Sequence, residues 1–119
     1  MTKTTGSLSI LQITDSHILP NPGDTLLGID THYYFQQVLE FAFAQNQHYD
    51  LLLLTGDLAQ DPCDSSYQQI LASLLKYQIP SICLPGNHDD LALMQRILTA
   101  KNSSCHKQLM FDHWQLICL

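Results

Sequence analysis

Three short polar segments interrupt a largely apolar chain, and each carries side chains that could bind a metal ion. They are Asp15-Ser16-His17, Gly56-Asp57 and Gly86-Asn87-His88-Asp89. Carboxylate, imidazole and amide oxygen together suit a divalent first-row metal. Taken singly, an Asp-x-His or a Gly-Asp is most often a cap or a turn. Gly-Asn-His-Asp is more specific, and the order of the three segments favours a functional site.

Each of these segments follows a predicted strand. Residues 8–14 alternate between apolar and polar, whereas residues 51–55 and 81–84 are short apolar runs typical of buried strands. The carboxyl ends of strands in an open α/β sheet form the edge that binds ligands. We therefore expect five side chains to converge there: Asp15, His17, Asp57, Asn87 and His88. Gly56 and Gly86 should allow the sharp turns that aim these ligands at one centre.

Helices are expected between the strands. The first should begin at Asp30 or Thr31 and run to about Gln47, and the second should be capped by Asp64 or Ser65. The first should bury Phe35, Val38, Leu39, Ala42 and Phe43, and the second Tyr67, Ile70, Leu71, Leu74 and Leu75.

A third helix should be capped by Asp89 or Asp90, and segments 108–111 and 114–119 should form a hairpin, with Trp114 in the core. The alternation of strands and helices predicts a layered α/β fold with a mostly parallel sheet.

Composition limits the class of protein. The chain has 119 residues, of which 45% are hydrophobic and 13% charged, so it is not a disordered tail. A formal net charge of −6 disfavours nucleic-acid binding through basic side chains. No apolar stretch is long enough for a signal peptide or a membrane span. The 4 widely spaced cysteines are expected to be reduced and mostly buried, as in a cytoplasmic protein.

The segments together resemble the calcineurin-like metallophosphoesterases. With their flanking sequence included, the segments are similar to those of the bacterial class III cyclic-AMP phosphodiesterase branch. The similar stretches are Leu11-Gln12-Ile13-Thr14-Asp15-Ser16-His17, Leu27-Gly28, Thr55-Gly56-Asp57-Leu58-Ala59-Gln60-Asp61 and Leu84-Pro85-Gly86-Asn87-His88-Asp89. The resemblance implies a β-sandwich flanked by helices. It also implies two divalent ions, Mn, Fe or Zn, and a bridging hydroxide that attacks a phosphodiester, with 3',5'-cyclic AMP as the expected substrate.

The resemblance also implies a role for each matching residue. Asp15 and His17 would ligate the first metal, Asp57 would bridge both metals, and Asn87 would ligate the second. Asn87 and His88 would contact the phosphate, with His88 as the catalytic residue that stabilises or protonates the leaving group. Asp61 would orient a metal ligand or the loop that carries it, and a turn or capping role is equally compatible with the sequence.

The chain departs from the family pattern because it has no Gly-His-x-His segment and stops at Leu119, within an apolar strand. We expect residues 1–7 to be a polar tail and residues 8–119 to be the N-terminal half of a metallophosphoesterase domain. The missing half would supply further histidine ligands and a second sheet. Without it, the chain is expected to form homo-oligomers through an exposed sheet face or the edge of the strand at 114–119.

Two alternatives remain open at this stage. The chain could be a non-catalytic remnant that serves as a binding or assembly module. It could also be an unrelated α/β binding domain whose Asp and His loops have no common function. Among substrates, the motifs do not distinguish a cyclic nucleotide from another phosphodiester or a phosphomonoester.

Overall fold

The computed structural model describes residues 7–45, 48–100, 102–111 and 113–118. Strands and helices alternate along most of the chain, as the sequence predicts. The elements are β1 (Ile10–Thr14), α1 (Thr31–Ala44), β2 (Leu51–Thr55), α2 (Asp64–Leu75), β3 (Ser81–Leu84), α3 (Leu91–Ile97), β4 (Ser103–Ser104), β5 (Gln108–Met110) and β6 (Gln115–Ile117).

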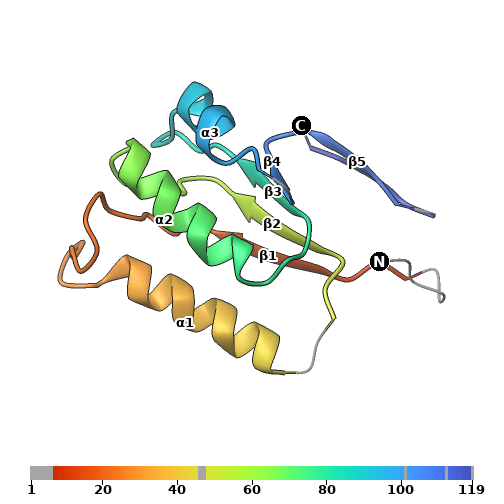
Figure 1. Ribbon diagram of the computed structural model, residues 1–119, viewed down its shortest axis with the longest axis horizontal. Helices are drawn as coiled ribbons and strands as arrows, with labels where there is room; N and C mark the ends of the chain where they lie inside the picture. The colour runs from red at the N-terminus through yellow and green to blue at the C-terminus, as the bar shows by residue number, and fades with distance from the viewer. Residues whose placement is uncertain (1–6, 46–47, 101, 112, 119) are drawn as a thin grey trace.

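The central sheet is parallel and has the strand order β1-β2-β3-β4. Consecutive parallel strands joined by right-handed crossovers place every connecting helix on the same face of the sheet. Figure 1 shows this arrangement, with α1, α2 and α3 lying in front of the sheet. The layered α/β class predicted from the sequence is therefore confirmed.

The core lies between the sheet and the helices. Sheet residues at alternate positions enter it, because successive side chains of a strand point to opposite faces. Its buried members include Leu52, Leu54 and Cys83 from the sheet, and Phe35, Leu39, Tyr67, Ile70 and Met94 from the helices.

The opposite face of the sheet is partly open among the described residues. Ile10, Gln12 and Thr14 of β1 are exposed, and they alternate with Leu11 and Ile13, which pack against the core. No described helix is long and apolar enough to cross a membrane.

Helix boundaries show where the predictions were right and where they were wrong. Asp30 caps α1 and Asp90 caps α3, each accepting a hydrogen bond from a backbone N–H in the first turn. The residue before α2 is Cys63, which makes no side-chain cap bond, so the predicted cap at Asp64 or Ser65 was wrong. The described part of α1 ends at Ala44, and the predicted end at Gln47 lies outside the described residues.

The remaining differences concern burial and short strands. Val38, Leu75 and Trp114 were expected to be buried, but they are 49%, 44% and 52% exposed. Strand β4 was not predicted, because a two-residue Ser-Ser pairing carries no apolar pattern. The hairpin of β5 and β6 is confirmed as antiparallel, although Asp112 in its turn and Leu119 lie outside the described residues.

Candidate metal centre

The loops after β1, β2 and β3 meet because backbone pairing continues past the ends of the strands. The Asp15 N–H donates to the Gly56 carbonyl at 3.0 Å, and the His17 N–H donates to the Asp57 carbonyl at 3.0 Å. The Gly56 N–H in turn donates to the Leu84 carbonyl at 2.9 Å. These bonds fix the three loops side by side at one edge of the sheet, as the sequence predicts.

Asp15, His17 and Asp57 form the candidate metal-binding group. Each offers a ligand atom, and these atoms lie within 4.8 Å of one another. His17 Nε2 is 3.6 Å from Asp15 Oδ1, and the two side chains are 24% and 54% exposed. The site is therefore open to solvent on the Asp15 side and more enclosed at the imidazole.

All three of these residues have left-handed backbone conformations. Their φ angles are 57° at Asp15, 46° at His17 and 45° at Asp57. Such angles are uncommon for residues other than glycine, and they are less unfavourable for Asp and His than for most side chains. Strained residues of this kind persist where the surrounding structure holds them in place, which is frequently at a functional site.

Gly56 and Gly86 are both favoured at the site, but for different physical reasons. Gly56 has a φ of 84°, so it provides the turn expected from the sequence. Gly86 instead allows a close approach, because a Cβ there would lie 2.3 Å from both the backbone nitrogen and Oδ1 of Asp57. Gly86 also begins the expected turn, since the Asp89 N–H donates to its carbonyl at 3.2 Å.

Asn87 and His88 join the group from the loop after β3. The Asn87 amide lies 3.2 Å from both carboxylate oxygens of Asp57. The His88 backbone N–H donates to Asp57 Oδ1 at 2.9 Å, and the His88 and His17 rings are 5.5 Å apart between centroids. All five residues expected to converge are thus at one edge of the sheet.

The donor set fits a divalent cation. With its NH₂ group toward Asp57, the Asn87 amide donates to both carboxylate oxygens at 3.2 Å, and the opposite amide orientation would present its oxygen to a cation bound beside Asp57. Two carboxylates, one imidazole and one amide oxygen match the ligands that Mn²⁺, Fe and Zn²⁺ accept. In a chain of net charge −6, bound cations would also offset the repulsion between Asp15 and Asp57.

Asp61, the candidate for an orienting role, is exposed, and its backbone carbonyl accepts a hydrogen bond from Ser66 Oγ at 3.0 Å. The residue that contacts His17 is its neighbour Gln60, whose Oε1 lies 2.8 Å from His17 Nδ1. The role assigned to Asp61 stays a prediction. Gln60 was missed because an amide in a loop gives no sequence signal of its own.

Asp89 is a second residue whose role the sequence did not indicate. Its Oδ2 accepts hydrogen bonds from the backbone N–H groups of Leu58 and Gly86, each at 2.9 Å. Its Oδ1 accepts from the Ala59 N–H at 2.9 Å and from the Tyr67 hydroxyl at 2.8 Å. One carboxylate therefore ties the loop after β2 to the loop after β3.

Tyr67 supports this carboxylate from the core of the molecule. Burial of the phenol and the adjacent Asp89 carboxylate both raise the pKa of Tyr67, although its bond to the Asp90 backbone opposes them. The hydroxyl thus stays protonated and remains a donor to Asp89 throughout the neutral range.

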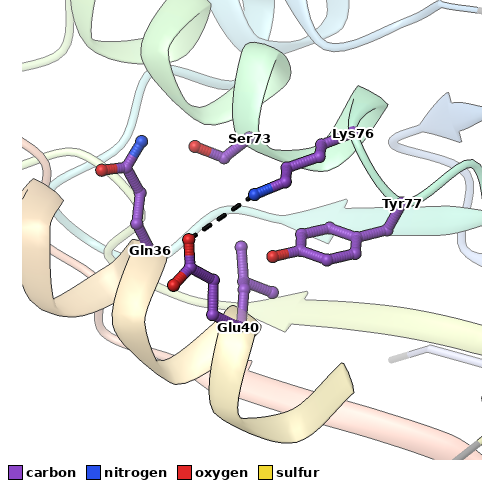
Figure 2. A pocket seen from close by; sticks show the side chains of 6 residues that line it. Gln36, Glu40, Ser73, Lys76 and Tyr77 are labelled. Carbon is purple, nitrogen blue, oxygen red and sulfur yellow. Dashed lines mark ion pairs between the residues drawn. The ribbon is translucent and has the colours of Figure 1, made fainter. Parts of the chain in front are cut away.

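A pocket between α1 and α2 is a poor alternative site. Its volume is about 40 Å³, well below the ~300 Å³ at which ligand pockets typically begin. Figure 2 shows its charged side chains, Lys76 and Glu40, facing one another, and their ion pair measures 3.5 Å. The lining residues are Gln36, Leu39, Glu40, Ser73, Lys76 and Tyr77.

Comparison with known proteins agrees with this geometry. The family model described as calcineurin-like phosphoesterase matches residues 8–119, so the chain belongs to that family. It is 36% identical over 111 residues to the 3',5'-cyclic adenosine monophosphate phosphodiesterase CpdA of Escherichia coli, an alignment that covers 92% of this chain and 40% of the relative.

Two further relatives have similar names. The chain is 38% identical over 112 residues to a 3',5'-cyclic-nucleotide phosphodiesterase of Nostoc sp., covering 94% of this chain and 42% of the relative. It is 31% identical over 117 residues to CpdA of Pseudomonas aeruginosa, covering 98% of this chain and 42% of the relative. The chain therefore spans about two fifths of the length of these relatives.

Proposed function

We propose that this chain carries the metal-binding edge of a phosphodiesterase that hydrolyses a small phosphodiester. The observation that supports this most strongly is the grouping of Asp15, His17 and Asp57 ligand atoms within 4.8 Å of one another. All three residues have left-handed backbone conformations, and backbone hydrogen bonds between the loops hold them in place. Such strain is expected at a functional site and not in a chance cluster of exposed acidic residues.

Two divalent cations are proposed to occupy the site. Asp15 and His17 would hold the first, Asp57 would lie between the two, and Asn87 would hold the second through its amide oxygen. When bound, such cations would supply positive charge against the phosphoryl oxygens and would make a water molecule a better nucleophile. Mn, Fe and Zn are all compatible with these ligands.

His88 is proposed as the general acid. Its ring lies beside His17, and its Nδ1 is 3.4 Å from the Gln60 carbonyl, which leaves Nε2 available to a substrate. As water oxygen bonds to phosphorus and the ester bond to the leaving oxygen breaks, protonated His88 would give its Nε2 proton to that oxygen. The proton lost by the water would pass to solvent.

The proposed substrate class is a cyclic nucleotide, 3',5'-cyclic AMP in the first instance. The relatives at 36% and 38% identity carry names that specify cyclic adenosine monophosphate or a cyclic nucleotide. An acidic chain can bind an anionic diester of this kind if cations lie between them. Such a substrate also agrees with the expected cytoplasmic location.

The direct test is hydrolysis of cyclic AMP and of a chromogenic phosphodiester by this chain with Mn²⁺ added. We expect turnover that Asp57→Ala abolishes and that the matched acidic variant Glu40→Gln leaves unchanged, since Glu40 pairs with Lys76 on the helical layer. Equal rates in Asp57→Ala and the unaltered chain would refute the assignment of the site.

A second candidate function is a non-catalytic assembly module, and the open face of the sheet favours it. Ile10 is 37% exposed there, beside the exposed side chains of Gln12 and Thr14. Self-association through this face would give a dimer in light scattering that Ile10→Lys weakens, with no Mn²⁺-dependent turnover. A monomer at high concentration would contradict it.

A further inference from the structure

Gln60 contacts both histidines of the site through two different oxygens. Its side-chain Oε1 lies 2.8 Å from His17 Nδ1, and its backbone carbonyl oxygen lies 3.4 Å from His88 Nδ1. The residue is half-buried in the loop between β2 and α2. The two histidines come from different loops, so Gln60 is the point at which both rings are held.

The backbone of Gln60 is fixed in turn by the loop after β1. Its N–H donates to the Ile18 carbonyl at 2.9 Å, and Ile18 pairs with Ala59 in a parallel bridge. Ile18 and Ala59 are both fully buried. The two oxygens of Gln60 are therefore presented from a rigid segment, and the side chain does not have to reach across solvent.

The chemistry of these contacts determines where each imidazole carries its hydrogen. Carbonyl and amide oxygens accept hydrogen bonds and cannot donate them. Each Nδ1 must then be the donor, which leaves Nε2 of the neutral ring with a lone pair. For His17 that lone pair faces the ligand group, because Nε2 lies 3.6 Å from Asp15 Oδ1.

We propose that Gln60 is a positioning residue that fixes His17 and His88 in the tautomer with hydrogen on Nδ1. For His17 this makes Nε2 a metal ligand, since a ligating nitrogen must be free of hydrogen and its ring is usually oriented through the other nitrogen. For His88 it reserves Nε2 for the substrate. The value of this arrangement for catalysis rests on the proposed function, whereas the tautomers themselves do not.

The test is a long-range proton–nitrogen correlation spectrum of the whole ¹⁵N-labelled chain, with chelator present. At about pH 8.5, above the ordinary titration range of imidazole, the spectrum reports which nitrogen carries the hydrogen. We expect Nδ1–H for His17 and His88. The exposed histidines His106 and His113 should show the Nε2–H form that neutral imidazole prefers in water.

Variants separate the two contacts of Gln60. Gln60→Ala removes the side-chain acceptor and should return His17 to Nε2–H, whereas His88 keeps Nδ1–H because its acceptor is a backbone carbonyl. Gln60→Glu retains an acceptor oxygen and should keep both rings in the Nδ1–H form. Gln36→Ala on α1, the matched control, should change neither ring.

Mn²⁺ affinity gives the second readout. Loss of a contact that orients a ligand typically weakens metal binding by about 10–100-fold, so Gln60→Ala should fall in that range and Gln60→Glu should recover most of the loss. A purely structural role would lower the melting temperature without changing the His17 tautomer.

Two results would overturn the positioning role. One is Nε2–H on His17 in the unaltered chain, and the other is an unchanged His17 tautomer in folded Gln60→Ala. If Gln60→Ala does not fold, the spectra of the unaltered chain and of Gln60→Glu still show whether His17 and His88 carry their hydrogen on Nδ1. Nδ1–H tautomers together with no Mn²⁺ binding would uphold the positioning role and reject the proposed metal function.

Discussion

The residues at the centre of the site are held in backbone conformations that their own side chains do not favour. Left-handed φ angles occur at Asp15, His17 and Asp57, where Gly or Asn would be less strained. This cost falls on the residues that are proposed as metal ligands, and the loop hydrogen bonds offset it. Stability and metal binding should therefore respond in opposite ways to substitution here.

The first prediction concerns Asp15→Asn. Asparagine tolerates left-handed backbone at least as well as aspartate, and the change removes the repulsion between Asp15 and Asp57. We expect a free energy of unfolding within about 0.5 kcal/mol of the unaltered chain, or higher. Mn²⁺ affinity should nevertheless fall at least about tenfold, because a charged ligand is lost. Chemical denaturation and Mn²⁺ titration, with Glu40→Gln as control, measure the two effects.

The second prediction concerns the close approach of Gly86 to Asp57. A Cβ at 2.3 Å from Asp57 Oδ1 forces the loops apart, so Gly86→Ala should lower the free energy of unfolding by about 1–3 kcal/mol and weaken Mn²⁺ binding. Gly23→Ala is the control, since no other atom lies near the Cβ position of Gly23, although its left-handed φ makes alanine strained there. It should reduce stability without affecting Mn²⁺ affinity, and equal Mn²⁺ affinities in both variants would contradict the account.

At the scale of elements, the loops after β2 and β3 act as one unit because Asp89 binds both of them. This carboxylate accepts hydrogen bonds from Leu58, Ala59 and Gly86 and from the Tyr67 hydroxyl of α2. It joins two strand ends to a buried helix position without contributing to the metal-binding group. The sequence predicted Asp89 or Asp90 as the cap of α3, and the cap is Asp90.

The third prediction is that Asp89→Asn lowers the free energy of unfolding by about 2–3 kcal/mol, since an amide cannot accept from donors on both sides. Mn²⁺ affinity should also fall, because the loop that carries Asn87 loses its attachment. Asp90→Asn is the matched control, and it should be nearly neutral because both residues cap helices equally well. Denaturation curves that coincide for the two variants would show that Asp89 has no such role.

The fourth prediction concerns strand β3, where burial raises the pKa of the Cys83 thiol to about 12. In the unfolded chain the thiol ionises near its ordinary value, so unfolding releases a proton at alkaline pH. Stability should thus be independent of this group below about pH 8 and should fall by about 1 kcal/mol between pH 9 and 10. Chemical denaturation gives the free energy of unfolding at pH 9 and at pH 10. The decrease between the two pH values should be smaller for Cys83→Ala than for Cys63→Ala, and equal decreases would contradict the prediction.

The elements that the sequence predicts best are those with a local signal. The caps at Asp30 and Asp90 follow from short polar residues placed just before apolar stripes. Strand β4 and the start of α2 were missed, because a Ser-Ser pairing and an uncapped first turn depend on tertiary contacts. The convergence of Asp15, Asp57 and Asn87 was predictable because parallel strands end at one edge.

The details of the site could not be predicted in the same way. The contact of Gln60 with His17 spans 43 positions, and the contact of Asp89 with Leu58 spans 31. The close approach at Gly86 is likewise a property of two loops rather than of either sequence. Such contacts depend on how the loops pack, which the spacing of residues does not specify.

On the scale of the whole molecule, the metal-binding edge and the open sheet face lie on one small layered unit. Figure 1 shows the helices gathered on the other face of the sheet, and the Asp15 side chain at the end of β1 is 54% exposed. The chain covers about two fifths of the length of its relatives, yet Asp15, His17, Asp57 and Asn87 are already assembled at this edge. The central claim is therefore that this edge binds divalent cations by itself.

Titration of Mn²⁺ into the whole chain, followed by the paramagnetic resonance of the free ion, tests this claim most directly. Asp57→Asn is the comparison, because it keeps the size and the acceptor oxygen of the proposed shared ligand and removes only its charge. The account predicts saturable binding to the unaltered chain and affinity at least about tenfold lower in Asp57→Asn. Absence of binding, or the same affinity in both proteins, would contradict it.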